Sequence, residues 1–221
     1  MTELTIRNQD ILDQLEYVRS AVMNANVEQY KDSFRFRPDE GAMTEGEKYL
    51  TKEWLDTHMS DPYHKGFPVE HYSIPLEGVM NKSPELEGVY NFSRFDFISN
   101  LGGNQSAVFL YYPPGGFVGW HTNQNNSGYQ FIFSYSEKGD GYFQYYDKQK
   151  QEIVKIPDVS GWNARYYHFG EDQPDHCWHS AYTNVPRITI CVLFRWWDKP
   201  QMKDQILAMK DQLIEEIEME I

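Results

Sequence analysis

Two histidines, an asparagine and an arginine in the second half of this chain have the chemistry of a site for a metal ion and an anion. His121 and Asn123 are two residues apart, so on an extended strand their side chains point to the same face and can address one small object together. His179 follows far downstream, and Arg187 comes eight residues after it. Imidazole is a common transition-metal ligand, and a planar guanidinium matches a carboxylate.

Each of these residues also has a structural interpretation. Arg187 begins a run of alternating apolar residues, 188–194, and an arginine at the start of a buried strand is costly unless an anion sits on it. The alternative for Arg187 is a salt bridge at the rim of the sheet. A histidine in a β-rich protein is more often a core or surface residue than a ligand. We keep that interpretation for four others, which are His58, His64, His71 and His168.

Short β-type runs dominate the chain from residue 107 onward. Clusters of Gly, Asp, Asn, Lys and Pro separate them, and the spacing of roughly ten residues favours a β-sandwich or roll over a βαβ fold. The predicted strands are residues 107–112, 128–135, 141–147, 152–156, 163–169, 177–182 and 187–197.

Helices are expected at both ends of the chain. Residues 10–23 carry apolar side chains at helical spacing, and residues 44–58 are a possible second helix. Residues 89–98 alternate partly and are predicted to form a strand. A closing helix follows Pro200, with one apolar stripe made of Met202, Ile206, Met209, Leu213 and Ile217.

Composition narrows the class of protein. The 221 residues are expected to form a single domain, with covering elements over 1–105, a β core over 106–198 and a terminal helix over 199–221. The formal charge of −13 disfavours nucleic acid as a partner. The sequence shows no membrane-spanning stretch and no secretory signal, so we expect a cytoplasmic protein whose Cys177 and Cys191 are reduced.

Three stretches between about residue 107 and residue 197 carry a family resemblance. They are Tyr-Pro-Pro-Gly-Gly-Phe-Val-Gly-Trp-His-Thr-Asn from Tyr112 to Asn123, Gly-Asp-Gly-Tyr-Phe-Gln-Tyr-Tyr-Asp over 139–147, and Trp178-His179 through Arg187 to Phe194. In this order they resemble the Fe(II)/2-oxoglutarate-dependent oxygenases. The likeness is to the prolyl-hydroxylase-like branch and to small phage-encoded members of that superfamily.

The resemblance implies a mainly β fold with flanking helices around a double-stranded β-helix core of the jelly-roll or cupin-like type. It implies that His121, Asn123 and His179 hold Fe(II), that Arg187 binds the C5 carboxylate of 2-oxoglutarate, and that Tyr112 contacts this co-substrate. His176 competes with His179 for the distal position. The substrate would be a small molecule or a protein side chain, in the cytoplasm of the host cell if the protein is phage-encoded.

Asn123 departs from the family pattern, because the second ligand is normally a carboxylate. A neutral amide leaves about one extra positive charge at the metal and should lower its affinity. Three outcomes are open: the amide oxygen ligates, an anion such as chloride enters, or the site is degenerate. Asp172 and Asp175 are possible substitutes for the missing carboxylate.

These alternatives give three hypotheses for function. The first is an active oxygenase, the second a non-catalytic jelly-roll binding module, and the third a structural or assembly protein. Four aromatic residues are candidates for a dry wall around the site, with plain core as the alternative; they are Trp120, Phe131, Phe133 and Trp178.

Overall fold

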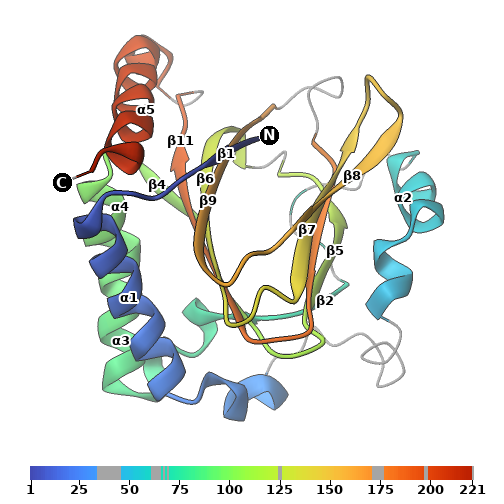
Figure 1. Ribbon diagram of the computed structural model, residues 1–221, viewed down its shortest axis with the longest axis horizontal. Coiled ribbons are helices and arrows are strands. Elements are labelled where there is room, and N and C mark those ends of the chain that lie inside the picture. Colours follow the sequence, from blue (N-terminus) through green and yellow to red (C-terminus); the bar gives the residue numbers. More distant parts are fainter. Residues whose placement is uncertain are drawn as a thin grey trace.

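Two antiparallel β-sheets face each other in the computed structural model, which describes residues 1–33, 46–60, 66, 68, 70–123, 126–170, 177–196 and 199–220 (Figure 1). The major sheet has the strand order β1-β9-β6-β11-β4-β3, and the minor sheet has the order β2-β5-β10-β7-β8. The strands are β1 (Thr2–Leu4), β2 (His71–Tyr72), β3 (Ile74–Pro75), β4 (Gln105–Tyr112), β5 (Phe117–His121), β6 (Gly128–Ser136), β7 (Gly141–Asp147), β8 (Glu152–Pro157), β9 (Gly161–Phe169), β10 (His179–Thr183) and β11 (Arg187–Phe194).

The eight strands from β4 to β11 form a jelly roll. Of these eight, the first, eighth, third and sixth lie side by side in the major sheet. The second, seventh, fourth and fifth lie side by side in the minor sheet, and all pairs are antiparallel. This order is that of a double-stranded β-helix. The predicted fold class, mainly β with flanking helices and a jelly-roll core, is confirmed.

Helices cover one face of the major sheet, while α2 lies beside the minor sheet on the other side of the molecule (Figure 1). The α-helices are α1 (Gln9–Asn24), α2 (Lys52–Met59), α3 (Pro84–Asn91), α4 (Phe97–Asn100) and α5 (Lys203–Glu218), with shorter helical turns at η1 (Val27–Ser33), η3 (Gly46–Leu50), η4 (Leu76–Gly78), η5 (Met80–Lys82), η6 (Phe92–Asp96) and η9 (Pro200–Met202).

Helix α1 shows how the sequence produces this cover. The Asn8 side chain accepts a hydrogen bond from the backbone N–H of Ile11 and so caps the first turn. One stripe at helical spacing is buried against the core: Ile11, Leu15, Val18 and Val22. The helices predicted over residues 10–23 and after Pro200 are both confirmed, and α2 with the preceding turn covers the described part of the one predicted over 44–58.

The strand predicted over residues 89–98 is wrong. These residues continue helix α3 through the π-helical turn η6 into α4. The start signal precedes the stretch: the Ser83 side chain caps the helix by accepting from the backbone N–H of Leu86, and Pro84 occupies the first helical position. Of the aromatic residues that suggested alternation, Phe97 instead packs against Phe133, whereas Phe95 is exposed.

Alternation along the major-sheet strands separates two environments. On β11, the side chains of Ile188, Ile190, Val192 and Phe194 join the core beneath the helices. The side chains between them face the space between the two sheets; they are Arg187, Thr189 and Cys191. The polar side chains therefore share one face of a buried strand.

Two further expectations concern the cysteines and membranes. Cys177 and Cys191 are both buried thiols that form no disulfide, as predicted. Among the described residues, no helix combines the length and the apolar character needed to cross a bilayer.

Candidate metal and anion site

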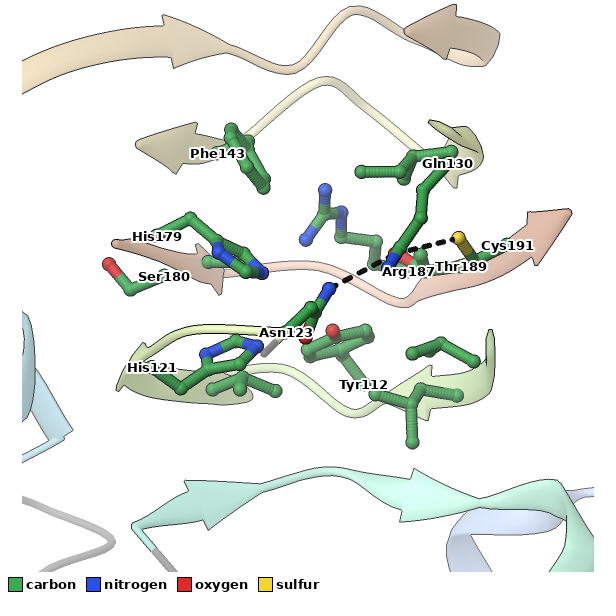
Figure 2. Close-up of a pocket in the computed structure, with 15 residues that line it drawn as sticks. Tyr112, His121, Asn123, Gln130, Phe143, His179, Ser180, Arg187, Thr189 and Cys191 are labelled. Carbon is green, nitrogen blue, oxygen red and sulfur yellow. Dashed lines mark hydrogen bonds between the residues drawn. The ribbon is translucent and has the colours of Figure 1, made fainter. Parts of the chain in front are cut away.

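One cavity between the two sheets brings together all five residues predicted for the site (Figure 2). Its volume is about 50 Å³, more than the roughly 10–15 Å³ that one water molecule needs. Tyr112 reaches it from β4, His121 from β5, His179 from β10 and Arg187 from β11. Asn123 reaches it from just beyond the end of β5. The rest of the wall is mostly apolar, with Val108, Leu110, Val118, Ile132, Phe143 and Ala181.

The two histidines are direct cross-strand partners. His121 on β5 pairs with His179 on β10, and their ring centroids are 4.0 Å apart. The register shifts between His179 and Ala181. Regular antiparallel pairing would place Ala181 opposite residue 119, but Ala181 pairs with Val118 instead. This bulge turns both Val118 and His121 towards the cavity, whereas strict alternation would place them on opposite faces.

Both imidazoles are held in the same way. The Nδ1 atom of His121 lies 2.8 Å from the carbonyl oxygen of Gly119, and the Nδ1 atom of His179 lies 2.8 Å from that of Cys177. A carbonyl can only accept, so Nδ1 carries the proton in both rings and Nε2 is the atom suited to a metal. Burial lowers the pKa of His179 to about 4, so this ring is neutral at physiological pH.

Asn123 is oriented by a neighbour that the sequence did not indicate. It lies two residues beyond the end of β5 and lines the same cavity as His121, so the two side chains can address one small object, as expected. Its Nδ2 donates a hydrogen bond of 3.0 Å to Oε1 of Gln130 on β6. The amide oxygen of Asn123 therefore points away from Gln130.

Arg187 is buried with only part of its guanidinium engaged. Its Nε lies 3.2 Å from Oδ2 of Asp158, and its Nη2 is 3.4 Å from the Ser134 hydroxyl. Its Nη1 has no hydrogen-bond partner among the described residues. The guanidinium carbon is 5.2 Å from the ring centroid of Tyr112, its cross-strand partner. Burial raises the pKa of Tyr112 although Arg187 opposes the shift, so the phenol stays protonated.

Among the described residues, the charges around Arg187 do not balance. The Asp158 side chain is fully buried and also lies 3.7 Å from Nη1 of Arg165, whose side chain is 2% exposed. Two buried cations thus share one buried carboxylate. Glu3 also contacts Arg165, but the Glu3 side chain is 65% exposed and is screened by solvent. An anion beside Arg187 would offset the remaining positive charge.

The donor set at the histidine end is unusual but usable. Within the part of the chain that the structure describes, no group of three His, Cys, Asp or Glu side chains is arranged to hold a metal ion. The cavity instead offers two imidazoles and one amide oxygen, which are nitrogen and oxygen donors that Fe(II) accepts. The alternative ligand His176 and the possible substitutes Asp172 and Asp175 lie outside the described residues.

The four aromatic candidates for the wall belong to the core. Trp120 and Trp178 pack with Leu55 of α2 on the outer side of the minor sheet. Phe131 and Phe133 pack under the helices. None of them is among the residues that line this cavity, so the plain-core alternative is confirmed.

Sequence reasoning missed two residues beside the site, Gln130 and Asp158. Gln130 was read only as part of a β-type run, and Asp158 only as part of a turn after β8. Alternation is the one available signal for Gln130, because it shares a strand face with Ile132 and Ser134. Asp158 has no sequence signal, because its burial depends on Arg187 and Arg165, which come from two other strands.

Neither a protein-family model nor a curated protein sequence matches the chain. Among solved structures, a prolyl-4-hydroxylase from Pseudomonas putida is 16% identical over 72% of this chain and 89% of its own, with a TM-score of 0.33. Hydroxypropylphosphonic acid epoxidase from S. wedmorenis, in complex with fosfomycin, is 15% identical over 39% of this chain and 42% of its own, with a TM-score of 0.26.

A predicted oxalate decarboxylase from Thermotoga maritima is 20% identical over 40% of this chain and 67% of its own, with a TM-score of 0.25. Identities and scores this low say nothing about what the present chain binds or catalyses. Its function has to be argued from the cavity itself.

Proposed function

We propose that this protein is a non-haem iron oxygenase that uses 2-oxoglutarate. The observation that carries the proposal is one cavity with a metal-binding end and an anion-binding end. At the first end, His121 and His179 are neighbours with the same tautomer. At the second, Arg187 is buried and its Nη1 has no hydrogen-bond partner among the described residues. A keto acid such as 2-oxoglutarate matches this arrangement. Its keto group and the neighbouring carboxylate can bind a metal at the histidine end, while its second carboxylate lies at the arginine end.

The residues have separate roles in this proposal. His121, His179 and the amide oxygen of Asn123 hold Fe(II), while Arg187 binds the C5 carboxylate and the protonated Tyr112 lies beside it. The iron and its keto acid, when bound, activate O2 to oxidise a C–H bond. The protein orients the bound groups and excludes water from them. Apolar side chains line the same cavity for this purpose; they are Val108, Leu110, Val118 and Ile132.

The substrate is proposed to be a small molecule or a protein side chain. The reacting C–H bond has to reach the histidine end of the cavity, because the arginine end is occupied by the co-substrate. Phe143 forms the wall beside His179, with the two ring centroids 5.6 Å apart.

An anaerobic titration tests the proposal. Fe(II) and then 2-oxoglutarate are added to the apo protein, and the visible charge-transfer band of an iron-bound keto acid is recorded. The wild type is expected to show the band and His179→Ala to lose it. Arg187→Lys is expected to keep it at roughly tenfold or higher 2-oxoglutarate concentration, because a point charge replaces the planar fork.

His71→Gln is the matched control. His71 is also buried, but it lies on β2, is not among the residues that line the cavity, and has its Nδ1 3.0 Å from the Ser73 hydroxyl. The variant should keep the band at the wild-type 2-oxoglutarate concentration. A wild type without the band, or a band that survives in His179→Ala, contradicts the proposal.

A non-catalytic binding module is the second candidate. The observation that favours it is the absence, within the described residues, of a carboxylate among the metal-facing side chains. Such a module would bind a carboxylate through Arg187 with the same affinity in the presence and absence of iron. Succinate formation that requires both His121 and His179 would exclude it.

A further inference from the structure

We propose that Gln130 is a positioning residue that selects an amide at position 123, so that the site is built for Asn123. The inference rests on the proposed metal site and goes beyond it, because it assigns a role to a residue outside the donor set. It also changes the interpretation of Asn123. Asn123 is then the residue whose side-chain amide Gln130 requires, and not a carboxylate that has been lost.

Gln130 has one orientation that satisfies its neighbours (Figure 2). Its Nε2 donates a hydrogen bond of 2.7 Å to the backbone carbonyl of Asn126. Its Oε1 accepts from Asn123 Nδ2 at 3.0 Å and from the Cys191 thiol at 3.3 Å. Gln130 is 1% exposed, so water does not replace these partners. The Asn123 amide and the Cys191 thiol donate to one end of the Gln130 amide, and the Asn126 carbonyl accepts from the other end. These three contacts together fix the orientation of the Gln130 amide.

Gln130 also links Asn123 to Asn126. The backbone N–H of Asn126 donates to the carbonyl of Asn123 at 2.8 Å. Gln130 contacts the side chain of Asn123 and the backbone carbonyl of Asn126. A single residue on β6 of the major sheet therefore contacts both Asn123, which follows β5 of the minor sheet, and Asn126, which precedes β6.

The orientation of the Asn123 amide follows from this arrangement. With Nδ2 directed at Gln130, Oδ1 is turned to the opposite side, and Asn123 lines the same cavity as His121 and His179. Without the acceptor on Gln130, the two ends of the Asn123 amide would differ little in energy. The hydrogen bond thus determines that an oxygen rather than a nitrogen is available to a metal ion.

A carboxylate at position 123 does not fit the same surroundings. It carries no N–H, so one of its oxygens would face Oε1 of Gln130. Rotating the Gln130 amide would remove that clash but would place its oxygen against the Asn126 carbonyl and leave the Cys191 thiol without an acceptor. Each arrangement leaves a buried polar atom unsatisfied, which is costly. Asn123, Gln130 and Cys191 therefore form a matched set.

Co(II) titration of the apo protein tests the inference through binding and a spectrum rather than through turnover. Gln130→Leu removes the acceptor while keeping the volume, so we expect Co(II) affinity to fall about tenfold or more, as for other residues that orient a metal ligand. The visible Co(II) spectrum should change as well, because one donor is lost. Gln130→Glu keeps an accepting oxygen and, protonated in this buried position, can still donate to Asn126; it should restore affinity to within about threefold.

Asn123→Asp is the second arm. Although it adds a negative charge, it should bind Co(II) no more tightly than the wild type, because Gln130 opposes a carboxylate. Wild-type affinity and spectrum in Gln130→Leu, or Co(II) binding about a hundredfold tighter in Asn123→Asp, would overturn the inference while leaving the metal site intact. A wild type that binds no Co(II) overturns the metal site and this inference together.

A measurement without metal covers the case in which Gln130→Leu does not fold. In the wild-type apo protein, the side-chain amide protons of Asn123 should exchange slowly with solvent, because one of them is held by Gln130. Gln130→Glu should retain that protection. Rapid exchange in the folded wild type would contradict the arrangement.

Discussion

The two faces of the major sheet differ in what their side chains require. On the helix-covered face, Phe131 and Phe133 of β6 are fully buried and need only neighbours of the right shape. On the cavity face of the same strand, Gln130 and Ser134 need partners of a particular chemistry. The helix-covered face of β6 therefore contributes to the core of the fold, and the opposite face contributes to the candidate metal and anion site.

The difference shows which residues tolerate substitution. Apolar neighbours on the helix side can be exchanged for others of similar volume at modest cost. On the cavity side, polar groups depend on particular partners, as Arg187 does on the charge of Asp158. Removing one member of such a pair leaves the other buried without its charge partner.

The largest expected effect is on the helix-covered face. Phe133→Ala should lower the free energy of unfolding by about 3–5 kcal/mol, because a fully buried ring is replaced by a cavity. Phe133→Leu should cost clearly less. Urea unfolding gives both values. Iron binding measured well below the melting temperature should be unchanged in Phe133→Ala; a specific loss of iron binding would mean that the two faces are not separable in function.

A smaller effect is expected from the charge on the cavity face. Asp158→Asn keeps the shape but removes the only buried carboxylate between Arg187 and Arg165 among the described residues. The free energy of unfolding should fall by about 3 kcal/mol. Addition of 2-oxoglutarate should raise the melting temperature of this variant more than that of the wild type, because an anion then offsets a larger positive charge.

Glu3→Gln is the control for Asp158→Asn. Glu3 contacts the same Arg165 at 3.4 Å, but its side chain is 65% exposed. Its loss should change stability by no more than about 0.5 kcal/mol. Equal effects of the two substitutions would contradict the charge account of the cavity face.

The smallest of the three main effects concerns His71, a buried histidine that does not line the cavity. Burial lowers the pKa of His71 to about 4, below its ordinary value of 6.5. The unfolded chain therefore binds more protons than the folded one between these pKa values, and stability falls as pH falls through this window. His71 should account for a loss of about 2 kcal/mol between pH 7.5 and pH 5.

His71→Gln removes this titration. Unfolding of the apo protein at pH 7.5 and pH 5 should show a smaller pH-dependent loss in the variant than in the wild type, which retains His71. An identical loss in both proteins would mean that His71 is not held in its neutral form by burial.

The helix-covered face is also the part of the fold that the sequence predicts best. Val192 and Phe194 belong to an alternating apolar run whose period identifies β11 directly. The prediction failed at residues 89–98, where aromatic residues such as Phe92 and Phe97 suggested a strand although Ser83 and Pro84 signal the start of a helix. Strand β5 was not predicted separately, because the bulge before His121 interrupts its alternation.

The cavity face was predictable only where a residue type carries its own chemistry. His121, His179 and Arg187 could be selected because imidazole and guanidinium groups suit a metal ion and a carboxylate, and because the motifs around them, in their order along the chain, distinguish them from the other histidines. Gln130 and Asp158 could not, because their roles depend on partners supplied by other strands and turns. Pairing across strands is set by the fold, and a single sequence does not display it.

Diffraction at the iron absorption edge, from crystals grown anaerobically with Fe(II), tests the central claim most directly. The account predicts one anomalous peak in the cavity, in contact with Nε2 of His121, Nε2 of His179 and Oδ1 of Asn123, with Gln130 still accepting from the Asn123 amide. A peak that does not contact Asn123, or an ordered cavity without a peak at saturating Fe(II), would contradict it.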